Sequence, residues 1–128
     1  MIATTQEWVS KAEGDFDVAC ILRRSRKPSR FDGICFHCQQ CAEKYLKGRL
    51  NEAGKTFAKT HDLGLLLKEA SVVEPLWAGL SVQLKRLTDY GVAVRYPGTS
   101  TDAAAAREAF ASCRKLRSLA RASLGLKA

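Results

Sequence analysis

The residues best suited to chemistry in this sequence are four polar side chains spaced three and four positions apart: His37, Gln40, Lys44 and Lys47. On a helix, this spacing places side chains along one side. An imidazole, an amide and two ammonium groups are donors suited to a phosphate. We therefore predict that this polar line faces a cleft or a partner subunit and binds phosphate. If the line faced bulk water, it would be only the polar side of an amphipathic helix.

Asp15 is the candidate acidic partner of the polar line. The other members of its helical stripe are apolar: Trp8, Ala12, Ala19 and Leu22. A carboxylate among such neighbours is costly to bury unless it is paired with a cation. Lys44 or Arg95 could supply that cation, which would connect the first helix to the polar line. The alternative is an Asp15 at the edge of the stripe, half solvated.

Helix signals recur along the chain, and alternating strand patterns are nearly absent. Start signals are a capping-box pattern at 4–7, Ser29 with Asp32, the run 60–62, Pro75 and the run 99–102. We expect helices over about 4–22, 29–53, 60–67, 75–94 and 103–122. Four long helices with brief connections predict an all-α, up-and-down four-helix bundle with one additional short helix, as a single domain over 1–128.

The composition favours an anionic partner. Among 128 residues, 21 Lys and Arg against 13 Asp and Glu give a net charge of +8, and 46% hydrophobic residues suffice for a core. Basic residues cluster at 23–30 and along the last helix, where they either contact nucleic-acid phosphates or form a solvated face. No secretory signal and no apolar run of the ~20 residues that a membrane span needs are present, so we expect a cytoplasmic protein without membrane contact.

Five cysteines, an odd number, argue against a disulfide framework and for free thiols. Cys35, Cys38 and Cys41 superficially resemble zinc spacing, but the only distant ligand candidates are His61 and Cys113. Small residues on a buried helix let its neighbours approach, and Cys packs as a small hydrophobe. We therefore expect packing cysteines, with no metal site and no cofactor.

Four blocks of sequence together resemble the HEPN family in its short, stand-alone form. They are Trp8-x3-Ala12-x2-Asp15-x3-Ala19, the run 36–47 (Phe-His-Cys-Gln-Gln-Cys-Ala-Glu-Lys-Tyr-Leu-Lys), Lys59-Thr60-His61-Asp62-Leu63, and Arg95-Tyr96-Pro97-Gly98. The resemblance covers nearly the whole chain. It implies a bundle of four main helices, a homodimer with a groove near its axis, and pairing with a small nucleotidyltransferase as toxin and antitoxin.

The resemblance also implies, for many members, RNA cleavage without a metal by an Arg followed four to six residues later by His. This chain departs from that pattern, because no His follows Arg95 through Asp102. Whether the chain is an enzyme therefore stays open, with Arg95, His37 and His61 as candidate catalytic residues. Arg95 also fits a plainly structural role at a helix C-terminus, and His61 fits one at a helix start.

Three functions remain in view. The first is a nucleotide- or RNA-phosphate-binding protein that acts with a small nucleotidyltransferase in a toxin–antitoxin-like pair. Its expected phosphate-binding residues are Asp15, His37, Gln40, Lys44, Lys47, Arg95 and Tyr96. The second is a metal-independent ribonuclease toxin, and the third is a non-catalytic adaptor whose basic faces grip an acidic protein.

Overall fold

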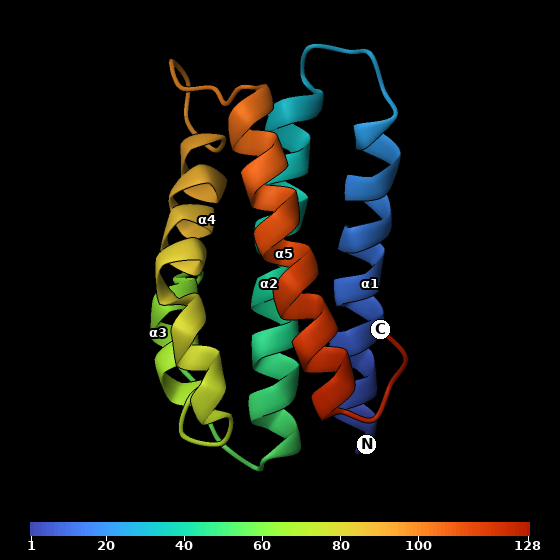
Figure 1. The fold of residues 1–128 in the computed structure, drawn as a ribbon, viewed down its shortest axis with the longest axis vertical. Helices are drawn as coiled ribbons and strands as arrows, with labels where there is room; N and C mark the ends of the chain where they lie inside the picture. Colours follow the sequence, from blue (N-terminus) through green and yellow to red (C-terminus); the bar gives the residue numbers. More distant parts are fainter.

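Four long helices run up and down in an antiparallel bundle, and short helical segments connect the second long helix to the third (Figure 1). The computed structural model describes residues 1–128. Its elements are α1 (Ala3–Arg23), α2 (Arg30–Glu52), α3 (Leu63–Ala70), the 3-10 helix η1 (Pro75–Leu80), α4 (Ser81–Ala93) and α5 (Ala103–Ser123). The predicted all-α bundle is confirmed. None of the helices combines the length and the apolar composition that crossing a membrane requires.

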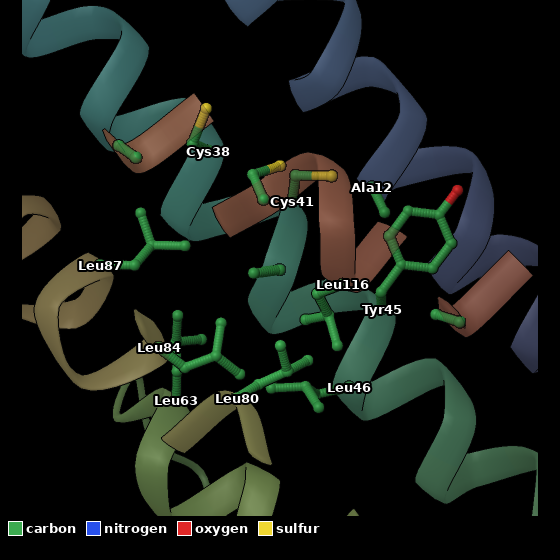
Figure 2. Close-up of a cluster of buried hydrophobic side chains, with 14 of the residues drawn as sticks. Ala12, Cys38, Cys41, Tyr45, Leu46, Leu63, Leu80, Leu84, Leu87 and Leu116 are labelled. Carbon is green, nitrogen blue, oxygen red and sulfur yellow. The ribbon is translucent and has the colours of Figure 1, made fainter. Parts of the chain in front are cut away.

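Helix α2 lies at the centre of the packing. It contacts α1, α3, α4 and α5, and its side chains Tyr45, Leu46 and Leu50 are fully buried. Leucines from α3, η1, α4 and α5 meet them in one core (Figure 2). The sequence predicted a deeply placed second helix because apolar residues cover more than half of its circumference.

Four of the five cysteines are buried and pack as part of this core. Cys38 and Cys41 on α2 lie against Cys113 on α5, which is also fully buried. A hydrogen bond with Cys113, together with burial, raises the pKa of the Cys41 thiol well above its usual range. These buried cysteines fill small spaces between helices, as predicted.

Two predicted helix starts lack the side-chain caps that the sequence suggested. The N-cap of α1 is Ile2, without a side-chain cap, and Thr5 of the expected capping box is buried, where its hydroxyl accepts a hydrogen bond from Asn51. Ser29 precedes α2, also without a side-chain cap. The expected cap of the box, Thr4, lies inside the first turn instead, because α1 begins at Ala3.

The other helix boundaries follow the sequence signals closely. Asp62 caps α3 by accepting from the backbone N–H groups of Gly64 and Leu65, and Asp102 caps α5 by accepting from Ala105. Gly54, with φ of +71°, follows the end of α2, as the stop signal predicted. The expected helix over 75–94 is divided, because Pro75 opens a 3-10 turn before the α-helical hydrogen bonds of α4 begin.

Gly91 marks the closest approach of α4 to α2, and replacing it should destabilise the protein. An ideal Cβ at Gly91 would lie 2.6 Å from Cγ and 2.7 Å from Cβ of the buried Gln39. We expect Gly91→Ala to lower the free energy of unfolding by about 1–3 kcal/mol, since the backbone must shift. Gly14→Ala is the matched control, because nothing lies within 4 Å there and alanine favours the helix. Equal melting temperatures of the two variants would contradict this packing.

Candidate functional site

The Asp15 carboxylate binds two side chains of the polar line. His37 Nδ1 donates to Asp15 Oδ1 at 2.8 Å, and Lys44 Nζ donates to Asp15 Oδ2 at 2.5 Å. The Asp15 side chain is 11% exposed, whereas those of His37 and Lys44 are 28% and 22% exposed. Asp15 is thus paired with Lys44, one of the two cations that the sequence offered. Both of its oxygens are satisfied, which offsets the cost of burial.

The packing of α1 on α2 makes this pairing possible. Ala12 and Ala19 on α1 are fully buried and bracket Asp15, so small side chains keep the two backbones close. His37 and Lys44 are seven residues apart, two helical turns, and so lie on the same side of α2. One carboxylate from α1 therefore reaches both.

A second polar network lies beside the first and is centred on Glu43. Its carboxylate binds Lys47 Nζ at 3.0 Å, His61 Nδ1 at 2.8 Å and Gln39 Nε2 at 3.2 Å. Gln39 also donates to the backbone carbonyl of His61 at 2.8 Å. Glu43 and Gln39 are buried, and the sequence analysis missed both as polar residues of the site. The spacing Gln39, Glu43, Lys47, four residues each, is the signal that could have found them.

Lys47 belongs to this second network and not to the first. Its side chain is 10% exposed, and its ammonium group lies 5.8 Å from the ring centroid of Trp8 and 5.9 Å from that of Phe57. The predicted role of Lys47 as a phosphate ligand beside Lys44 therefore has little geometric basis. Gln40 lies between the networks, since its Nε2 donates to Gln39 Oε1 at 2.8 Å.

Arg95 lies near the polar line but does not pair with Asp15. Its Nε donates to the Gly91 carbonyl at 3.2 Å, which is the structural role predicted for a cation at a helix C-terminus. Its guanidinium carbon is 5.3 Å from the ring centroid of Phe36, and that ring meets the His37 ring edge-on at 5.1 Å. Phe36 therefore connects Arg95 to the first network.

The remaining candidates lie further out. The side chain of His61 is 60% exposed, with its Nδ1 bound to Glu43, and Tyr96 is exposed after the end of α4. The structure therefore gathers Asp15, His37 and Lys44 into one cluster, adds Arg95 through Phe36, and leaves Tyr96 apart.

On α5, the predicted basic face divides in two. Arg117 donates to Glu13 through two hydrogen bonds of 2.7 and 2.8 Å, and Arg121 donates to the Tyr45 hydroxyl at 3.1 Å. Burial raises the pKa of Glu13, but the hydrogen bonds from Arg117 and Tyr45 outweigh it, so the pKa is lowered. These two arginines are structural, whereas Arg107 and Arg114 stay exposed.

The HEPN domain family model matches residues 5–123 of the 128, which confirms the family resemblance. No curated protein and no solved structure matches the chain. The match includes both polar networks, the Phe36 contact and the basic residues of α5.

The Glu43 network should make stability depend on pH. Burial raises the pKa of Glu43, but hydrogen bonds from His61, Lys47 and Gln39 together lower it below its ordinary value of 4.5. A lowered carboxyl pKa contributes stability above the unfolded-state value, and this contribution is lost as the pH falls through the folded-state pKa. Acid titrations of unfolding free energy should therefore show wild type losing stability below about pH 4.5, where protonation of the unfolded chain begins.

Glu43→Gln isolates this contribution. Because the buried Lys47 ammonium loses its counter-charge, we expect this variant to be about 3 kcal/mol less stable at neutral pH and to have a flatter pH dependence below pH 4.5. Asp89→Asn removes an exposed carboxylate on α4 and serves as the control. Identical pH profiles for wild type and Glu43→Gln would show that the network adds nothing to stability.

Proposed function

Because the chain belongs to the HEPN family, we propose that it binds nucleotide or RNA phosphate on the outer side of α2 and acts with a small nucleotidyltransferase in a toxin–antitoxin-like pair. Family membership supports a nucleotide- or RNA-related function. The finer assignment rests on one observation: Asp15 holds an imidazole and an ammonium group side by side at a partly exposed surface.

Asp15 orients both donors, and each keeps further hydrogen-bonding capacity for a ligand. Lys44 uses one of its three N–H groups on Asp15, and His37 uses Nδ1, which leaves Nε2 free. When His37 is protonated, the three groups together carry a charge of +1, and both cations can donate to a phosphate oxygen. A fixed orientation lowers the entropy that a ligand must lose on binding.

Arg95 is the third proposed ligand. It is exposed, and its single side-chain hydrogen bond through Nε leaves both terminal nitrogens of the guanidinium available for bidentate contact with a phosphate. The Phe36 ring lies next to both the Arg95 guanidinium and the His37 ring. A phosphate held between Lys44 and His37 would place the rest of a nucleotide toward Phe36 and Arg95.

The partners follow from the family resemblance. We propose a cytoplasmic homodimer that pairs with a small nucleotidyltransferase. Light scattering after size-exclusion chromatography measures the dimer. Co-purification with a nucleotidyltransferase encoded beside this chain measures the pairing, and failure to co-purify would remove that partner.

Removing the two cations that we propose as phosphate ligands, Lys44 and Arg95, should weaken binding without unfolding the protein. We expect Lys44→Ala with Arg95→Ala to raise the Kd for a fluorescent ATP analogue by about tenfold or more, since each lost charge-assisted hydrogen bond contributes roughly 1.5–3 kcal/mol. Fluorescence anisotropy measures the Kd, and circular dichroism measures the helicity.

The charge-matched control replaces two exposed lysines on other surfaces, Lys68→Ala with Lys85→Ala. An equal change of Kd in both double variants would show that only net charge matters. A wild-type protein that binds a protein partner but no nucleotide would instead favour the adaptor function.

A specific contact favours a second candidate, metal-independent RNA cleavage. The Phe36 ring lies 5.3 Å from the Arg95 guanidinium carbon and 5.1 Å from the His37 ring, so a cation and an acid–base group flank the same aromatic side chain. In such a reaction Arg95 would stabilise the phosphate charge, and His37 Nε2 would exchange a proton with the 2′-hydroxyl or the leaving oxygen.

This candidate has a direct assay. Purified protein should degrade a labelled RNA in the presence of EDTA, and His37→Ala or Arg95→Ala should reduce the rate by about a hundredfold or more, the usual contribution of a general acid or base. Lys85→Ala, which removes an exposed cation outside both polar networks, is the control. Intact RNA after prolonged incubation with the wild-type dimer would end the ribonuclease hypothesis.

A further inference from the structure

A groove with a strongly positive lining runs along α5, beside the end of α1 and the start of α2. Two adjoining cavities form it, with volumes of about 540 and 310 Å³, and they share Arg23 and Arg107. No carboxylate lines either cavity. Five cations do: Arg23, Arg30, Arg107, Arg114 and Lys115.

None of these five cations forms an ion pair within the chain. Two other arginines of α5, Arg117 and Arg121, differ in this respect, because both form ion pairs with Glu13. Like charges gathered without compensation repel one another and create a positive potential that attracts anions. The groove therefore has a charge that only an external partner can neutralise.

Two of the cations, Arg23 and Arg30, lie over aromatic rings. The Arg23 guanidinium lies 3.9 Å from the centroid of Phe110, which stacks on Phe16 at 5.6 Å and 20°. The Arg30 guanidinium lies 4.1 Å from the centroid of Phe31 and donates to the carbonyl of Lys27 at 2.9 Å. Cation–π contacts of this kind fix a guanidinium while leaving its edge free for phosphate.

The groove is longer than one phosphate. Arg107 and Lys115 are eight residues apart on α5, which corresponds to about 12 Å along the axis at ~1.5 Å per residue. One strand of helical nucleic acid carries a phosphate about every 3.4 Å of axis. A length of about 12 Å covers roughly three such spacings, so the cations of α5 can contact more than one phosphate of the same strand, and Arg23 and Arg30 extend the lining.

We propose that this groove binds the phosphodiester backbone of a single nucleic-acid strand, as a site separate from the nucleotide-sized cluster around Asp15. Four of its five cations are arginines, whose planar forks suit phosphate geometry. The lining is longer than one phosphate group and contains no carboxylate. Phe110 is buried beneath Arg23, and Arg30 lies over the half-buried ring of Phe31, so we expect binding that does not depend on base stacking or on sequence.

The test uses the whole protein and a labelled oligouridylate, with the Kd measured by anisotropy at several salt concentrations. In the groove variant, Arg23, Arg107 and Arg114 are all replaced by Ala. Each lost contact with a single strand removes about 0.7 from the slope of log Kd against log salt, so the slope should fall by about 2. At low salt the Kd should rise by about tenfold or more. Binding of the ATP analogue should not change, which separates this proposal from the one on α2.

The control variant replaces three exposed cations that lie outside the groove and outside the basic cluster at 23–30, Lys11, Lys68 and Lys85, with Ala. Its slope and Kd should stay near wild type. If the groove variant unfolds, Arg107→Gln with Arg114→Gln changes only exposed side chains and should lower the slope by about 1.4. Equal losses in groove and control variants, an unchanged slope, or no wild-type binding to oligouridylate would overturn the proposal. Preference for a polyglutamate peptide over oligouridylate would overturn it in favour of an acidic protein partner.

Discussion

The burial of Asp15 against α2 is the constraint on which the candidate site depends. A carboxylate that is 11% exposed beside a helical core needs cationic partners, and α2 supplies them from positions two turns apart. The same requirement applies to the second network, where the buried Glu43 carboxylate accepts hydrogen bonds from Lys47, His61 and Gln39. The polar side of α2 is therefore an ordered surface of paired charges. That order is what lets a helix enclosed by four neighbours carry so many polar groups.

The fold could be predicted from the sequence because its signals are local. Asp62, Asp102 and Gly54 act through backbone groups within a few residues, so they mark helix boundaries correctly. The signal failed at Thr4, because α1 begins at Ala3 and its N-cap is Ile2, whose side chain cannot accept a hydrogen bond. The division of the helix after Pro75 was also missed, because a proline in the first turn fits both α and 3-10 geometry.

The site was predictable only in part. The cost of burying a charge predicted a cationic partner for Asp15 and left Lys44 and Arg95 as alternatives, and only the structure selects Lys44. The bond between Glu43 and His61 depends on how the segment before α3 returns to α2, and no pattern in the sequence fixes that path. The bonds of Arg117 to Glu13, across 104 residues, likewise needed the packing of α5 on α1. Charge patterns therefore suggested where cations gather but not which of them are already neutralised.

The Asp32 carboxylate joins two distant parts of the chain, because it accepts from the backbone N–H and the hydroxyl of Thr101 at 2.8 and 2.7 Å. These two hydrogen bonds connect the segment before α5 to the first turn of α2. Arg107 follows on α5, and Arg30 belongs to that first turn of α2. The spacing between the opposing walls of the basic groove is thereby set by a bond internal to the fold. An incoming polyanion would meet a preorganised surface, so little of its binding energy would go into rearranging the protein.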